Sequence, residues 1–150
     1  MFSGFTQFLD VIETELRKAG YVTARIDGTK TATQRAAAQD ALRRGEARVL
    51  LVSTRAGGVG LNLVRANHVV MADLWWNAAV DEQAWDRCHR LGQTRPVTVT
   101  RLIAEDSVEE RILELQEAKQ ALGTGALRKL TPQEAVKARL SDIRKLFSME

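Results

Sequence analysis

Several features that would define a functional site are scarce in this sequence. The 150 residues contain one cysteine, two histidines and two prolines. A single cysteine, Cys88, excludes an internal disulfide and fits a reducing compartment. The histidines, His68 and His89, do not supply a zinc-ligand cluster together with Cys88, so we expect no metal site. No stretch approaches the ~20 apolar residues of a membrane span. No signal-peptide pattern opens the sequence, so we expect no membrane partner.

The composition is that of an ordinary globular protein. Apolar residues make up 45% of the chain and charged residues 27%, and a chain of this length can bury a substantial core. The formal net charge of +3 points weakly to a polyanionic partner. Mildly basic proteins that never touch nucleic acid are common, so charge alone assigns no function.

Complete nucleotide-binding loops are also lacking. The segment Gly28-Thr29-Lys30-Thr31 has part of a phosphate loop, but that motif requires glycine at positions 24 and 29. The pair Asp81-Glu82 resembles a magnesium-binding pair but falls inside an expected helix, not at the end of an apolar strand. Gly58-x-Gly60 lacks the third glycine of a dinucleotide fingerprint. We therefore expect that this chain cannot hold ATP and Mg²⁺ alone.

Apolar runs and helical periodicities alternate along the chain. Strands are expected at 21–26, 49–52, 68–72 and 97–103, and the first residues read as the tail of another. Helices are expected at 6–19, at 31–44 after a capping box at Thr31-x-x-Gln34, and at 78–91. A further capping box, Ser107-x-x-Glu110, opens a helix that reaches about 122. This alternation predicts an α/β domain with a parallel sheet and helices on both faces.

The stretch Gln83–Gln93 is the most informative part of the sequence. As a helix ended by Gly92, it places Gln83, Arg87 and Arg90 on one stripe. On the other side Ala84, Cys88 and Leu91 would pack inward. Two guanidinium groups on a rigid element suit a highly charged oxyanion. A solvated helix that pairs its arginines with nearby carboxylates is the alternative interpretation.

Five motifs in order resemble the second motor lobe of superfamily-2 helicases, and of the Swi/Snf-type DNA-dependent ATPases in particular. They are Phe2–Thr6, Asp27–Thr29, the Gly-rich segment Ser53–Leu63, the tryptophan motif Asp73–Asn77 and Asp86–Gln93. Two departures occur: many family members carry Lys at the position of Arg55, and the usual Asn-Pro is Asn77-Ala78 here. The resemblance implies a RecA-like lobe.

The resemblance also implies roles for individual residues. Arg87 and Arg90 would act as arginine fingers on ATP. Gly58, Gly60 and Gln83 would face the nucleotide between two lobes. DNA would contact Ser53, Thr54, Arg55 and Trp76. ATP and Mg²⁺ would be held mainly by an N-terminal RecA-like lobe, so this chain alone is expected to be inactive.

The C-terminal part resembles the Rad-type repair branch, which includes the helicase-like transcription factor. We expect a RecA-like lobe at 1–122 and a helical extension, or brace, at 123–150. The branch implies a nuclear protein that works on double-stranded DNA in repair or chromatin remodelling. Nucleosomes or repair factors are further candidate partners. A stand-alone binding module without ATP turnover remains the alternative; an RNA helicase lobe fits the motifs less well.

Overall fold

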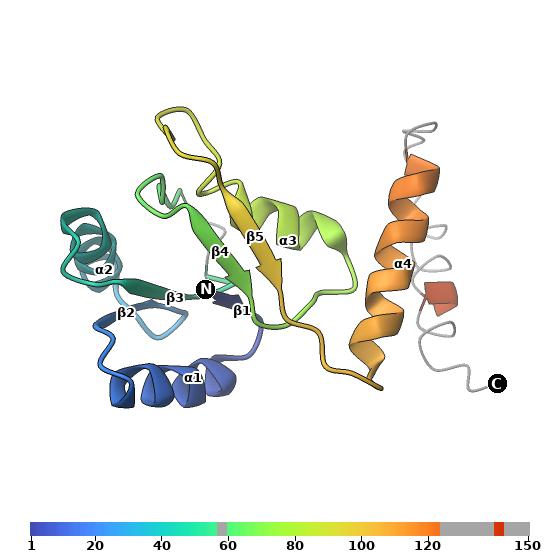
Figure 1. Ribbon diagram of the computed structural model, residues 1–150, viewed down its shortest axis with the longest axis horizontal. Coiled ribbons are helices and arrows are strands. Elements are labelled where there is room, and N and C mark those ends of the chain that lie inside the picture. Colours follow the sequence, from blue (N-terminus) through green and yellow to red (C-terminus); the bar gives the residue numbers. More distant parts are fainter. Residues whose placement is uncertain (57–59, 124–139, 143–150) are drawn as a thin grey trace. The chain divides into compact units, whose positions relative to one another are not determined.

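The computed structural model describes residues 1–56, 60–123 and 140–142 (Figure 1). Nine elements follow one another along these ranges. They are β1 (Phe2–Ser3), α1 (Thr6–Lys18), β2 (Thr23–Ile26), α2 (Ala32–Arg44), β3 (Val49–Ser53), β4 (His68–Met71), α3 (Ala78–Trp85), β5 (Thr98–Arg101) and α4 (Val108–Gly123). The alternation of strands and helices expected from the sequence is present.

The five strands form one sheet in the order β2-β3-β1-β4-β5, and all neighbours run parallel. The register aligns Phe2 of β1 with Val52 of β3 and with Met71 of β4. The parallel sheet predicted from the sequence is therefore confirmed. In a parallel sheet all carboxyl ends meet at one edge, and this edge is where ligands of such folds bind.

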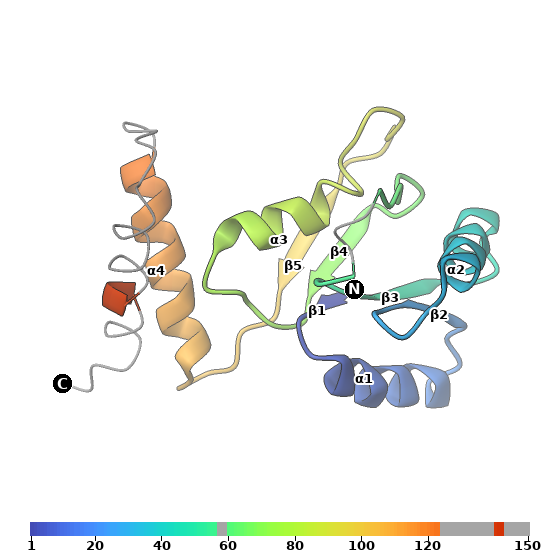
Figure 2. The same cartoon turned by 180° about the vertical axis from the view of Figure 1, so that it is seen from behind.

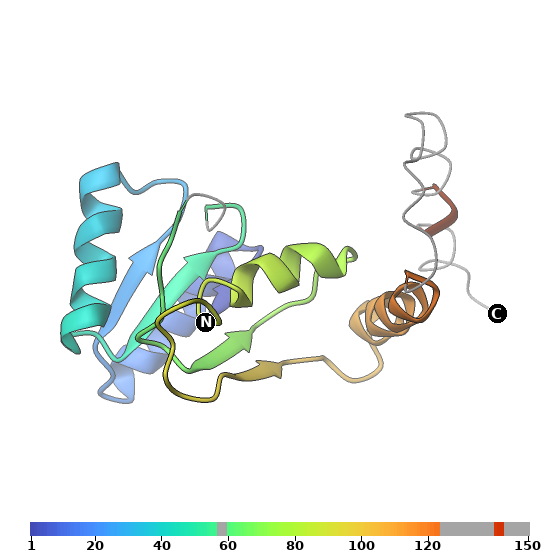
Figure 3. The ribbon, with the colours of Figure 1, turned by 90° about the horizontal axis from the view of Figure 1, so that it is seen from above.

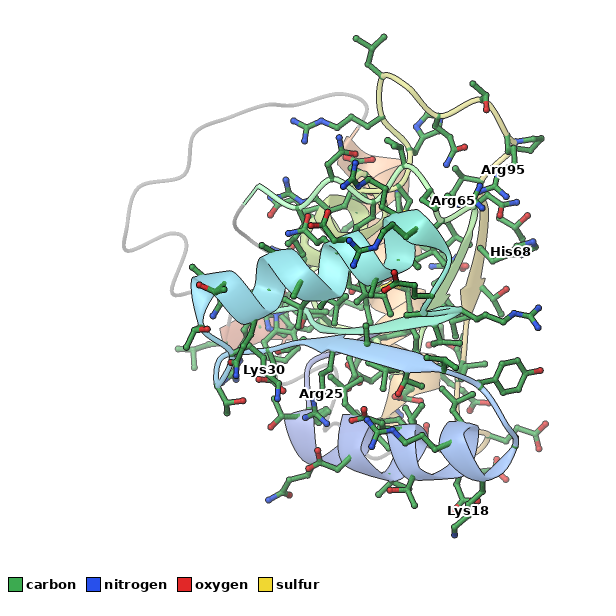
Figure 4. All side chains as sticks on the ribbon, turned by 90° about the vertical axis from the view of Figure 1, so that its left-hand side faces the viewer. Lys18, Arg25, Lys30, Arg65, His68 and Arg95 are labelled. Carbon is green, nitrogen blue, oxygen red and sulfur yellow. The ribbon has the colours of Figure 1, made fainter. Side chains whose placement is uncertain are left out.

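Helices cover both faces of the sheet, as expected. One core cluster joins Leu50 and Val52 of β3 to Leu42 of α2 and Ala84 of α3. The intervening Leu51 is fully buried outside that cluster, as expected when successive strand residues point to opposite faces. Figure 4 shows α2 and α1 on opposite sides of β2 and β3, and Figures 2 and 3 show α3 over one face of β4 and β5.

Helix α2 shows how local sequence sets an element. The Thr31 side chain accepts a hydrogen bond from Gln34 N (3.2 Å), and the Gln34 side chain accepts one from Thr31 N (3.0 Å). This is the predicted capping box. Gly45 ends the helix at φ 77°, the left-handed conformation that glycine adopts without steric penalty.

The chain divides into two compact units, Met1–Ile103 and Ala104–Glu150. The boundary expected at 122/123 leaves α4 with the RecA-like lobe, whereas the division into compact units groups α4 with the later residues. An ion pair between Lys119 Nζ and Asp142 Oδ2 (2.5 Å) ties α4 to the later segment. Of the extension expected at 123–150, only Gly123 and residues 140–142 lie within the described residues.

The start of α4 corrects one detail of the sequence analysis. Ser107 Oγ accepts from Glu109 N at 3.1 Å, so Ser107 does cap the helix. The carboxylate that reaches back belongs to Glu109, which accepts from Ala104 N at 2.8 Å. The expected partner was Glu110.

Across the described ranges, no helix is long and apolar enough to cross a bilayer.

Candidate functional site

The carboxyl edge of the sheet brings three of the sequence motifs together. Asp73, at the end of β4, accepts hydrogen bonds from Ser3 Oγ and from Gly4 N, the latter at 2.8 Å. Thr54 N donates to Ser3 O at 2.9 Å. Ser3 is fully buried and Asp73 is nearly so. The Asp73 carboxylate thus fixes the β1–α1 turn against the end of β4.

Gly4 lies in the middle of this junction. A Cβ atom added there would stand 3.3 Å from Asp73 Oδ1 and 3.7 Å from both Thr54 Oγ1 and the Trp75 ring. The absence of a side chain therefore lets the turn sit close to the ends of β3 and β4. The tryptophan motif then leads directly into α3, because the Asn77 side chain accepts from Ala79 N at 3.2 Å and caps the helix.

The four residues expected to contact DNA sit near this edge with different exposures. Arg55 is exposed, and Thr54 and Trp76 are half-buried. Ser53 is 2% exposed, so its hydroxyl offers no surface to a phosphate in this lobe. The sequence pattern missed this because Ser53 is the last residue of β3 and continues its buried run. Three of the four residues therefore remain candidate contacts.

At the end of β2 lies a charged cluster to which the sequence assigned no role beyond a turn. Asp27 is 2% exposed, and its Oδ1 accepts from Thr29 N (2.9 Å) and Thr29 Oγ1 (2.6 Å). Its Oδ2 accepts from Arg25 Nε at 2.6 Å. Arg25 also pairs with Asp10 and Glu13 of α1. This network fixes the loop that leads from β2 to the cap of α2.

The network holds both charges in their ionised forms. Burial alone would raise the pKa of Asp27, but the hydrogen bonds from Thr29 and the Arg25 guanidinium together lower it below its usual value. Burial alone would lower the pKa of Arg25, and its carboxylate partners raise it instead. A hollow of about 630 Å³ beside the cluster is lined by side chains of both signs. Its walls therefore favour no ligand of a single charge.

The segment with the two candidate arginines differs from the prediction. Helix α3 ends at Trp85, and the expected helix to Leu91 is wrong. Continuing the helix would require Arg87 O to accept from the N–H four residues later. Leu63 N donates to Arg87 O instead, at 2.9 Å, and Cys88 N and His89 N both turn back to Trp85 O. A tertiary contact thus replaces the helical one.

The change of backbone moves the side chains off one helical stripe. Gln83 and Arg90 are exposed and Arg87 is half-buried, so all three keep accessible surface. Cys88 is buried as expected, and burial raises the pKa of its thiol. Leu91 is fully exposed, so its predicted inward packing is wrong. In the turn it now occupies, no helical face directs it toward the core.

Arg87 carries an unusual feature for a half-buried arginine. Its Nε is buried and has no hydrogen-bond partner within the described residues. A buried donor without an acceptor is unfavourable, and such groups are few in native structures; the Nε of the half-buried Arg35 on α2 is another. Because Nε itself is covered, an external acceptor would have to meet another part of the half-buried side chain. An oxyanion supplies the acceptor that matches this fork best.

The Gly-rich segment is described only in part. Gly60 is exposed, has φ 58°, and has no atom within 4 Å of where a Cβ would lie. Gly58 lies outside the described residues. Leu61 and Leu63 are buried and attach this segment to the core cluster that also contains Cys88.

In the described ranges, no group of three or more His, Cys, Asp or Glu residues could hold a metal ion.

Besides the Arg25–Asp27 network, sequence reasoning missed the roles of Asp73 and Gln93. Asp73 was placed at the end of a strand and at the start of the tryptophan motif, but its side chain was given no task; its position after a buried strand is the available signal. Gln93 was read as part of a motif without a task of its own. Its side chain joins two loops that are distant in sequence. No local sequence pattern predicts a contact of this kind.

Comparison with known proteins gives a consistent result. Residues 1–92 match the family described as Helicase conserved C-terminal domain. The chain is 46% identical to DNA repair protein RAD5 of Cryptococcus neoformans over 100% of its own length and 12% of the relative. It is 40% identical to Helicase-like transcription factor of Homo sapiens over 98% of its length and 15% of the relative. The chain thus spans about an eighth of these relatives.

A solved structure agrees with the family match and with the two relatives. The C-terminal part of the Fun30 ATPase domain superposes with a TM-score of 0.75 and 36% sequence identity. The superposition covers 96% of this chain and 45% of that one. This likeness is high enough to confirm the RecA-like lobe expected from the motifs.

Proposed function

Because the chain belongs to the helicase C-terminal domain family, among its Swi/Snf-type members, we propose that it is the second motor lobe of an ATP-dependent enzyme acting on double-stranded DNA. In this role the lobe does not hold the nucleotide by itself. It closes against an N-terminal RecA-like lobe elsewhere in the motor, which binds ATP and Mg²⁺. Turnover then drives translocation along the duplex.

The observation that carries the proposal is the arginine turn that follows α3. Arg87 and Arg90 extend from a segment fixed by a backbone bond to Leu63, and both side chains keep accessible surface. Phosphoryl transfer spreads negative charge over the γ-phosphate oxygens, and an arginine supplied by a partner lobe accelerates such reactions by ~10³ to 10⁵. The two guanidinium groups suit that task.

Two further residues of this chain suit an anionic ligand. Exposed Gly60 leaves its backbone open to close approach, and Gln83 offers an amide one turn before the arginines. We assign the magnesium ion to the first lobe, since no group of three or more His, Cys, Asp or Glu residues in the described part of this lobe could hold a metal ion. What this lobe supplies is charge stabilisation and orientation.

We place the DNA on the carboxyl edge, around Thr54, Arg55 and Trp76. The junction of Ser3, Gly4 and Asp73 holds β1, β3 and β4 in fixed positions there. Contacts from this edge would reach the sugar-phosphate backbone, which carries no sequence information directly. The repair names of the relatives favour a nuclear role in DNA repair, with nucleosomes or repair factors as further candidate partners.

The arginines provide the test. In the full-length protein, Arg87→Lys and Arg90→Lys keep the charge but lose the planar fork, since lysine is a compact point charge. Each should lower the DNA-stimulated turnover of ATP by on the order of 10²- to 10³-fold. DNA affinity and melting temperature should stay near wild type. Phosphate release, a fluorescence titration with duplex DNA and thermal melting measure these quantities.

Arg43→Lys on the exposed side of α2 is the matched control, because it makes the same chemical change at a surface ion pair. It should leave turnover unchanged. Wild-type turnover in both test variants would show that the turn is only a surface feature. A large drop in melting temperature would instead make the arginines structural.

A further inference from the structure

The side-chain amide of Gln93 joins two loops of the lobe. Its Nε2 donates to Val64 O (2.9 Å), Ala66 O (2.9 Å) and Cys88 O (3.2 Å), and its Oε1 accepts from Arg95 N (3.0 Å). The reverse orientation of the amide would set Oε1 against three carbonyl oxygens, so only this one satisfies all partners. The two N–H groups serve the two nearer carbonyls, and the third bond is shared.

The two loops are the parts of the site on which the proposed function depends. One follows the Gly-rich segment, and the other carries the arginine turn. Their backbones also meet through Leu63 N and Arg87 O, and Gln93 N donates to Arg90 O at 2.9 Å. The Arg95 guanidinium donates to Arg65 O, and Figure 4 shows these two arginines next to each other at one edge. Gln93 thus lies at the centre of a loop-to-loop junction.

This junction substitutes for a missing helix. Helix α3 ends at Trp85, and one further helical bond, from His89 N to Trp85 O (3.0 Å), spans Arg87, while the carbonyl of Arg87 itself bonds to Leu63 N. Cys88 anchors the turn in the core, and the bond from Leu63 N holds the carbonyl of the residue before it. The amide of Gln93 fixes Cys88 O from the other side. The positions of both guanidinium groups therefore depend on a polar contact that lies outside the reacting atoms.

We propose that Gln93 is a positioning residue for ATP hydrolysis: its amide holds the arginine turn against the loop after the Gly-rich segment, and so sets where Arg87 and Arg90 meet the nucleotide. The inference rests on the proposed function and adds a residue to it. Gln93 touches neither substrate nor DNA in this account. Its effect on turnover passes entirely through the arginines.

The test uses the full-length protein with Gln93→Leu, which keeps the approximate size of the side chain and removes every hydrogen bond of the amide. A misplacement of about 1 Å lowers the rate of a catalysed step by about 10²-fold. We expect kcat to fall by that order while KM for ATP and the affinity for duplex DNA stay within about threefold, because ground-state binding lies mostly in the other lobe. Gln7→Leu, the same change at an exposed position of α1, should leave all three at wild type.

A double variant separates positioning from a general loss of structure. If Gln93 acts through the arginines, adding Gln93→Leu to Arg90→Lys should lower kcat much less than it does in the wild-type background. Fully multiplicative losses would overturn the inference. So would equal changes in kcat and KM, which indicate a lobe that is loosened as a whole.

The outcomes also distinguish this inference from the proposed function. Slow arginine variants together with wild-type turnover in Gln93→Leu would overturn the role of Gln93 and leave the motor lobe in place. Wild-type turnover in the arginine variants would overturn both. If Gln93→Leu does not fold, Gln93→Asn gives the same comparison, because its shorter side chain keeps an amide that cannot reach both loops. Loss of folding in both variants would make Gln93 purely structural.

Discussion

Replacing Arg25 by methionine gives the sharpest test of how the carboxyl edge is held together. The Arg25 side chain is 13% exposed and pairs with Asp27, which is 2% exposed. Removing one partner of a buried ion pair leaves an uncompensated charge, at a loss of about 3 to 5 kcal/mol. Thr29 still donates two hydrogen bonds to Asp27, so we take the lower end.

The other contacts of Arg25 change this figure little. Asp10 is 63% exposed, and pairs of that kind contribute at most about 1 kcal/mol. Glu13 is only 15% exposed, but it keeps Arg17 and Thr23 as partners after the substitution. A loss of about 3 kcal/mol in the free energy of unfolding corresponds to a fall in Tm of roughly 10 °C for a chain of this size. The assay is thermal melting of the purified chain, followed by circular dichroism at neutral pH and moderate salt.

Lys18→Met is the matched control, since Lys18 pairs with Glu15 and both side chains are about two-thirds exposed. Figure 4 shows Lys18 pointing outward from α1, while Arg25 lies between α1 and the sheet. We expect a change of at most about 0.5 kcal/mol for the control. Equal Tm changes in the two variants would refute the argument.

A second variant checks the cause. If the loss in Arg25→Met comes from the orphaned carboxylate, Arg25→Met with Asp27→Asn should be more stable than Arg25→Met alone. A double variant that is less stable than either single one would show that the guanidinium contributes by packing, and that the buried charge is not the source of the loss.

Two further predictions concern pH and DNA. The pKa of the Asp27 carboxyl is lower in the folded state than the unfolded value of about 3.9, so its carboxylate stabilises the fold at higher pH, and this stabilisation is lost as the pH falls through the folded pKa. Tm measured against pH should therefore fall less steeply in acid for Asp27→Asn than for the wild type. Identical acid limbs for the two proteins would contradict this prediction. In the full-length protein, Arg55→Ala should weaken duplex binding equally for all DNA sequences. It should also reduce the slope of the logarithm of the DNA association constant against the logarithm of the salt concentration by about one. A loss of affinity that depends on the DNA sequence in fluorescence titrations would rule out a phosphate contact.

The sequence was sufficient to predict those elements that are determined by residues close together in the chain. The capping box at Thr31 and the glycine at Gly45 fix both ends of α2 within a few residues, and the structure shows both. The apolar run that became β3 is of the same kind, because a strand covered on both faces must be continuously apolar. Motif order then indicated the family, since five matches in sequence constrain the topology as well as the chemistry.

Where the determinant is a contact between distant residues, the sequence was insufficient. The hydrogen bond between Ser3 and Asp73 joins residues 70 positions apart, and the local sequence around either residue does not predict its partner. The end of α3 was misplaced for the same reason. The sequence from Ala78 to Leu91 has helical periodicity throughout, but Leu63 N takes the Arg87 carbonyl that the helix would need. Periodicity describes what a segment prefers alone, and tertiary contacts can override it.

That override bears on function as well as on the fold. On a continuous helix, Arg87 and Arg90 would be held by the helix itself and would tolerate changes elsewhere in the lobe. On a turn, their positions depend on Leu63 and Gln93. Any movement of the loop after the Gly-rich segment is therefore transmitted to the arginines through bonds of about 3 Å.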